Sequence, residues 1–157
     1  MSAPIINSKL TNFKVQAYHN NEFKTLGGTY LSLDQLLRES DIVSLHLALG
    51  PETRHIINAE KLVLLKPAAF LVNTARGGLV DSVALSAALN AGKLQGAGLD
   101  VFENEPPKSD DPLLNAQHTV LTPHLGYKTR EALLRKLDVT FSNIADFEKG
   151  IGTNRVA

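Results

Sequence analysis

Three polar segments in the second half of the sequence carry side chains that could together reduce a 2-keto acid by hydride transfer. They are NTARGGLVD at residues 73–81, GLDVFENEPP at residues 98–107 and VLTPHLGY at residues 120–127. Arg76 offers a planar guanidinium, which binds a substrate carboxylate through paired hydrogen bonds. His124 is the candidate donor of the proton that the carbonyl oxygen needs. Glu105 is the candidate carboxylate that holds this imidazole protonated and in one tautomer.

Each of these side chains also has an ordinary explanation when it is taken alone. An arginine after a strand is usually solvated or ion-paired, and a loop histidine more often caps a turn or faces water. Glu105 lies in an acidic loop with Glu103, Asp110 and Asp111, where solvated charges are expected. The other histidines, His19, His46, His55 and His118, are interpreted as structural or exposed. No pair of histidines or carboxylates has the spacing of metal ligands, so no metal site is predicted.

The elements that must position these residues follow an α/β pattern. Short aliphatic runs alternate with helical patterns, which predicts a parallel sheet with flanking helices. Strands are predicted at residues 13–18, 41–47, 69–73, 97–102 and 119–122. The run at 41–47 is almost continuously apolar, and we expect it to be covered on both faces. Since ligands of such sheets bind beyond the carboxyl ends of the strands, the polar segments should gather at one edge.

The predicted helices begin at recognisable caps. They span residues 32–38, a stretch from Pro51, residues 58–65, residues 81–92 and residues 129–149. Ser32 and Gln35 form a capping-box pattern, and Asn58 and Asp81 are N-cap residues. The last helix has an apolar stripe at helical spacing, made of Leu133, Leu137, Phe141 and Ile144.

Composition limits the class of protein. A chain of 157 residues is one domain, and its 16 basic and 16 acidic residues balance to zero. No basic stripe is present, which argues against nucleic acid and anionic membrane surfaces as partners. No cysteine is present, no secretory signal is visible, and no apolar run approaches the roughly 20 residues of a membrane helix. We therefore expect a cytoplasmic protein.

Taken together and in order, the three segments resemble the NAD-dependent D-2-hydroxyacid dehydrogenases. The sequences DIVSLHLALGPETRHIIN, LTPHLGYKTREA and GIGTNRVA add to this resemblance, which covers nearly everything from Phe13 onward. It implies that Arg76 binds the substrate carboxylate, that His124 is the acid–base residue and that Glu105 is its partner. The implied substrates are small 2-keto or 2-hydroxy acids.

The resemblance also implies NAD or NADP as the cofactor. The residues expected along the nicotinamide are Leu47, Thr74, Ala75, Arg76, Asp100, His124, Gly126 and Tyr127. After the first predicted strand, Tyr18, His19 and Asn20 stand where an acidic residue would normally hold the adenosine ribose. The preference between NAD and NADP therefore stays open.

One part of the family pattern does not occur. None of the 11 glycines forms a G-x-G-x-x-G loop, and residues 13–18 align with the family's second strand. We therefore expect an incomplete Rossmann-like sheet, with residues 1–12 as a non-matching extension and residues 13–157 as a partial NAD(P)-binding domain. A sheet without its first strand should be interrupted between its second and fourth strands.

Three functional expectations follow from this incomplete pattern. The first is a truncated dehydrogenase domain with weak or no turnover as an isolated chain. The alternatives are a non-catalytic module that pairs with a second copy or a full-length relative, and a gene fragment.

Overall fold

The structure is a computed structural model, which describes residues 16–17 and 29–154. The chain divides into two compact units, Met1–Pro123 and His124–Ala157. The first unit contains the strands and most of the helices, and the second contains one long helix.

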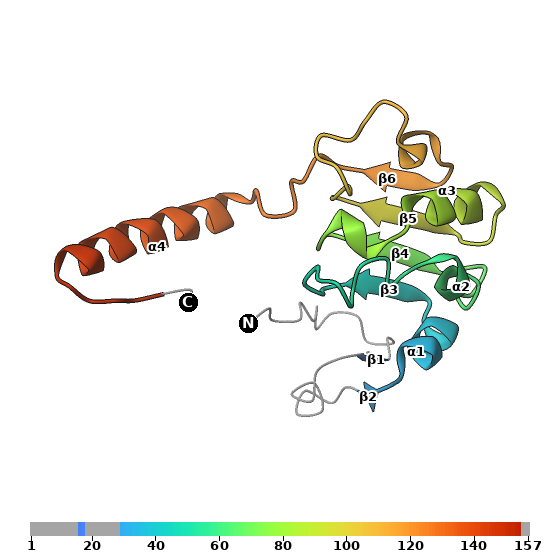
Figure 1. Ribbon diagram of the computed structural model, residues 1–157, viewed down its shortest axis with the longest axis horizontal. Helices are drawn as coiled ribbons and strands as arrows, with labels where there is room; N and C mark the ends of the chain where they lie inside the picture. Colours follow the sequence, from blue (N-terminus) through green and yellow to red (C-terminus); the bar gives the residue numbers. More distant parts are fainter. Residues whose placement is uncertain (1–15, 18–28, 155–157) are drawn as a thin grey trace. The chain divides into compact units, whose positions relative to one another are not determined.

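A four-stranded parallel sheet forms the centre of the first unit. Its strands are β3 (Ile42–Leu45), β4 (Phe70–Asn73), β5 (Gly96–Leu99) and β6 (Thr119–Leu121), in the order β3-β4-β5-β6. In Figure 1 the four arrows run in the same direction, so the loops that leave the strands gather at one edge. The predicted parallel α/β fold is thereby confirmed.

Two further strands form a separate sheet. β1 (Gln16–Ala17) pairs in parallel with β2 (Thr29–Tyr30). Gln16 and Ala17 lie in the first predicted strand, whose other residues, like the predicted extension at 1–12, fall outside the described residues. The expected interruption of the sheet is confirmed among the described strands, because β1 and β2 do not share the sheet of β3 to β6.

One face of the four-stranded sheet carries the core. Val43, Leu45, Leu71 and Leu99 alternate with exposed positions along the strands and are buried. They form a single cluster with residues of α1 (Leu33–Glu39), α2 (Ala59–Leu62), α3 (Ser82–Asn90), η2 (Gly77–Leu79) and η3 (Pro112–Asn115). Burial of each leucine in this cluster contributes about 1.5–3 kcal/mol relative to exposure.

The opposite face of the sheet is open among the described residues. Ile42 is 50% exposed, Phe70 45% and Val120 69%. The prediction that the strand at 41–47 is covered on both faces is therefore wrong, since β3 alternates between exposed and buried residues. The physical reason is that the described helices of this unit place their buried residues in the one core on the other face.

Local capping explains where the helices begin. The capping box of Ser32 and Gln35 is confirmed at α1. Asn58 accepts from the Lys61 amide and Asp81 from the Ala84 amide, both at 3.0 Å. Gly92 follows α3 with a φ of 65°, a left-handed conformation that a glycine adopts without strain.

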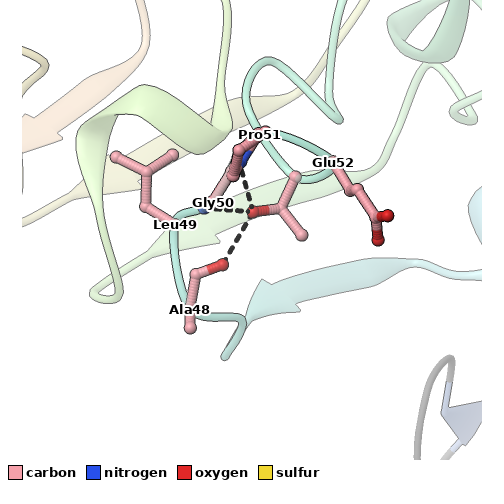
Figure 2. Close-up of a pocket in the computed structure, with 6 residues that line it drawn as sticks. Ala48, Leu49, Gly50, Pro51 and Glu52 are labelled. Carbon is pink, nitrogen blue, oxygen red and sulfur yellow. Dashed lines mark hydrogen bonds between the residues drawn. The ribbon is translucent and has the colours of Figure 1, made fainter.

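The helix predicted from Pro51 is wrong, because residues 51–55 form turns. The Thr53 hydroxyl donates to the Ala48 carbonyl at 2.7 Å and accepts from the Gly50 amide at 2.8 Å, as the dashed lines in Figure 2 show. Such bonds between a side chain and the nearby backbone compete with helical hydrogen bonds. The short elements β2, η2 and η3 were not predicted either.

The second unit consists mainly of α4 (Arg130–Glu148). The Thr129 hydroxyl accepts from the Ala132 amide at 3.1 Å, and Gly150 follows the helix with a φ of 72°. The prediction of a helix over 129–149 is confirmed. No residue of α4 is buried, so the apolar stripe is exposed. No helix in the described part of the chain is long and apolar enough to cross a membrane.

Candidate active site at the carboxyl edge of the sheet

The predicted site residues of the first unit all follow the carboxyl ends of neighbouring strands. Leu47 comes after β3, Thr74 to Arg76 come after β4, and Asp100 and Glu105 come after β5. Because β3, β4 and β5 are parallel neighbours, these segments leave the sheet at the same edge. The prediction that they gather at one edge is confirmed for this set.

The turn after β4 presents the Arg76 side chain to solvent. Arg76 is the N-cap of η2 and has extended backbone angles. Its Nη1 donates to the Ala75 carbonyl at 2.7 Å, and the side chain of Asn73 contacts the backbone of the same turn. Since a guanidinium has five N–H donors, most of this donor set is left to bind an anion.

Gly77 allows the Arg76 turn to lie directly against the loop after β5. A Cβ atom at this position would fall within 3.0 Å of the Phe102 carbonyl group and the Glu103 nitrogen. Real Cβ atoms essentially never come so close to other atoms, so only glycine fits here without a shift of the backbone. The loops that carry Arg76 and Glu105 are therefore packed backbone to backbone.

An ionic cluster joins the loop after β3 to the loop after β5. The Glu103 carboxylate pairs with the Arg54 guanidinium, and its other oxygen lies 3.4 Å from the His55 Nε2 atom. The His55 amide donates to the Gly78 carbonyl at 2.8 Å, so the loop after β3 is also hydrogen-bonded to the turn after β4. The interpretation of Glu103 as a solvated charge is corrected, because its partners lie 48 and 49 residues away in sequence.

Asp100 is a buried carboxylate at the end of β5. It is 5% exposed, and its Oδ1 accepts from the Thr122 hydroxyl at 2.5 Å. The Asp100 amide donates to the Asn73 carbonyl, and the Thr122 amide donates to the Leu99 carbonyl, both at 3.0 Å. The segments that follow β4, β5 and β6 are thus hydrogen-bonded to one another at the edge. Thr122 was not singled out in the sequence.

Glu105 is exposed, and its Oε1 accepts from the Phe102 amide at 3.1 Å. This bond holds the carboxylate against its own loop. His124 begins the second unit, with a left-handed φ of 54°. Its ring makes an edge contact with the Tyr127 ring, with centroids 5.8 Å apart. The pairing of Glu105 with His124, and the placement of Gly126 and Tyr127 along a cofactor, stay predictions.

A hollow of about 330 Å³ lies beside this edge (Figure 2). It is lined by residues 48–53, the turn that replaces the helix predicted from Pro51. None of the three predicted catalytic residues lines it, although Leu49 lies beside Gly78 of the neighbouring turn. Among the described residues, no group of three or more His, Asp and Glu side chains is arranged to hold a metal ion.

Comparison with known proteins identifies the family of the chain. Residues 6–126 match the NAD binding domain of the D-isomer specific 2-hydroxyacid dehydrogenases. The chain belongs to this family. A hydroxypyruvate reductase of Blautia hydrogenotrophica is 39% identical over 140 residues, which cover 89% of this chain and 44% of the relative. A glyoxylate reductase of Korarchaeum cryptofilum is 47% identical over 127 residues, which cover 81% of this chain and 38% of the relative.

Solved dehydrogenase structures of the family have the same fold. The NAD-complexed form of a D-isomer specific 2-hydroxyacid dehydrogenase from Lactobacillus delbrueckii ssp. bulgaricus superposes with a TM-score of 0.80 at 34% identity. The match covers 90% of this chain and 48% of that structure. The chain therefore spans less than half the length of each of these three relatives. The resemblance seen in the sequence is confirmed, as is the Rossmann-like fold.

Proposed function

We propose that the chain carries the substrate-binding and proton-transfer residues of an NAD(P)-dependent oxidoreductase that interconverts small 2-keto and 2-hydroxy acids. The observation that supports this most directly is the Arg76 turn. It presents an exposed guanidinium at the carboxyl edge of the sheet, and the buried carboxylate of Asp100 follows the neighbouring strand β5 at the same edge. Arg76 could thus bind an anionic substrate and Asp100 could accept from a cofactor amide, and the two residues follow adjacent strands.

The side chains at this edge fit the nicotinamide end of NAD or NADP. A carboxamide is both donor and acceptor of hydrogen bonds, and the Asp100 carboxylate accepts while the exposed Thr74 offers a hydroxyl. Thr122 holds Asp100 in place through its hydroxyl. When bound, the cofactor supplies or removes the hydride. Asp100, Thr74 and Ala75 would hold its carboxamide, and the remaining chemistry belongs to the chain's own residues.

In this proposal Arg76 binds the substrate carboxylate through two parallel N–H···O bonds, which also fixes the orientation of the neighbouring carbonyl. His124 donates a proton to the carbonyl oxygen in the reductive direction and takes it back in the oxidative direction. Glu105 favours the protonated imidazole by its charge. Its Oε1 accepts from the Phe102 amide, and a carboxylate has further acceptor sites on its second oxygen for the imidazole.

The experiment is a comparison of three purified chains: the unmodified chain, Arg76→Lys and the matched control Arg54→Lys. Each is mixed with NADH or NADPH and then glyoxylate or hydroxypyruvate, and nicotinamide oxidation is followed. Hydrogen bonds to charged groups contribute about 1.5–3 kcal/mol, so Arg76→Lys should lower kcat/KM by roughly 10- to 150-fold. Arg54 is committed to Glu103, and its substitution should leave kcat/KM within about threefold.

Equal activities of Arg76→Lys and the unmodified chain would refute the role of Arg76. If turnover of all three chains is too slow to follow, the same comparison is made by calorimetric binding of oxamate in the presence of NADH. A chain that binds neither cofactor nor oxamate would refute the proposed function. The expectation that the isolated chain turns over weakly stays a prediction, which the first assay also tests.

A further inference from the structure

Asn73 is a polar side chain at a position where the core would accept an apolar one. It is the last residue of β4, it is 1% exposed, and its register neighbours Leu45 and Leu99 are both buried. Burial of an amide is unfavourable unless its donors and acceptors are paired. An apolar residue of similar size would avoid this cost, so the partners of the amide indicate what it does.

Both ends of the Asn73 amide bind the backbone of the turn that carries Arg76. Its Oδ1 accepts from the Ala75 amide at 3.1 Å, and its Nδ2 donates to the Arg76 carbonyl at 2.9 Å. The same carbonyl also accepts from the amide of Leu79, the last residue of η2, at 3.2 Å. One buried side chain therefore binds the Thr74–Ala75 and Arg76–Gly77 peptide groups, and the Ala75–Arg76 peptide group lies between these two.

We propose that Asn73 is the positioning residue of Arg76, so that it sets the place of the guanidinium that binds the substrate carboxylate. This inference rests on the proposed function. The link to the side chain is the Ala75 residue. Asn73 binds its amide, and the Arg76 Nη1 donates to its carbonyl, in the next peptide group, at 2.7 Å. Without the two hydrogen bonds of the Asn73 side chain, the peptide groups next to Arg76 can rotate, and the guanidinium moves with them.

Three variants separate positioning from general stabilisation. Asn73→Ala removes both bonds, and Asn73→Asp keeps the acceptor for the Ala75 amide but loses the donor to Arg76. The matched control is Asn90→Ala, because the Asn90 Oδ1 accepts from the Gln117 amide at 2.9 Å, in a segment that precedes β6. All four chains are titrated with NADH, and with oxamate in the presence of NADH, by calorimetry.

Loss of a hydrogen bond to a charged ligand group lowers affinity by about 10- to 100-fold. We therefore expect Asn73→Ala to weaken oxamate binding by about 10- to 100-fold. NADH affinity should fall by a clearly smaller factor, because Thr74 and Ala75 of the same turn are only part of the proposed cofactor site. Asn73→Asp should fall between Asn73→Ala and the unmodified chain, and Asn90→Ala should bind both ligands normally. If Asn73→Ala binds oxamate as the unmodified chain does, or loses NADH and oxamate affinity equally, the inference is wrong.

Two further readouts do not depend on ligand binding. In Asn73→Ala the Ala75 amide should exchange with deuterium about tenfold faster, and Arg76 should change its rate of modification by phenylglyoxal relative to Arg54. Neither should change in Asn90→Ala. An unmodified chain that binds neither NADH nor oxamate would refute the proposed function, and these two readouts would still decide the positioning role. An unchanged Ala75 exchange rate or an unchanged Arg76 modification rate would overturn it.

Discussion

Gly77→Ala tests whether the Arg76 turn and the loop after β5 are packed as closely as the structure shows. The added methyl group would meet the carbonyl carbon and oxygen of Phe102 and the nitrogen of Glu103. These are backbone atoms, and the Phe102 side chain is itself buried at 8% exposure. The methyl group cannot be accommodated by rotating a flexible side chain, so one of the two loops must move.

The expected loss of stability follows from two opposing terms. Overpacking a buried site costs about 1–3 kcal/mol, and the backbone obstacle places Gly77→Ala at the upper end of that range. Replacing glycine by alanine also lowers the conformational entropy of the unfolded chain, which stabilises the folded state by about 0.4–1 kcal/mol. The free energy of unfolding should therefore fall by about 2 kcal/mol. With a urea m-value of about 2 kcal/mol/M, the unfolding midpoint should fall by about 1 M.

The assay is urea unfolding followed by circular dichroism, with Gly98→Ala as the matched control. Gly98 lies in β5, the strand that precedes the same loop, and a Cβ atom there would meet nothing within 4 Å. Gly98→Ala should leave the midpoint unchanged or raise it slightly, since only the unfolded-state term remains. Equal midpoints for the two variants would refute the close packing. A change in the m-value of Gly77→Ala would show that the surface exposed on unfolding had changed as well.

Substitutions at three other positions test the remaining interactions. Glu103→Gln should lower the free energy of unfolding by less than about 1 kcal/mol, because its partner Arg54 is 56% exposed. In thermal melts, the difference in stability between this variant and the unmodified chain should shrink at high salt. Thr122→Val should lower the free energy of unfolding in urea by about 1–3 kcal/mol, since Asp100 is a buried acceptor. Thr122→Ser should keep the bond, so equal free energies of unfolding for the two variants would contradict the role of the hydroxyl. Leu85→Ala should cost about 2–5 kcal/mol, because Leu85 is fully buried, and a cost under 1 kcal/mol would place it outside the core.

The features that could be predicted from the sequence are those whose causes are local. A capping box needs only two residues three positions apart, and Ser32 and Gln35 form it as expected. Asn58, Asp81 and Thr129 cap their helices by the same kind of short bond. The carboxyl edge was also predictable, because parallel topology alone brings the ends of neighbouring strands together.

The features that were missed depend on contacts between distant parts of the chain. No periodic pattern relates Glu103 to Arg54 and His55, whose pairing requires the folded sheet. The open face of β3 could not be predicted from its apolar run, because apolar strand residues do not reveal which face a helix covers. Asn73 was visible in the sequence only as part of a polar segment, since its two backbone partners show only in the folded turn.

The site residues of the first unit take their positions from the covered face of the sheet. The parallel hydrogen bonding continues past the strand ends, where the Asp100 amide donates to the Asn73 carbonyl and the Thr122 amide to the Leu99 carbonyl. Asn73 and Leu99 are buried in the same layer as the helices' leucines. The backbone at Asp100 and at the start of the Arg76 turn is therefore held by β4 and β5, whose last residues are buried in the core.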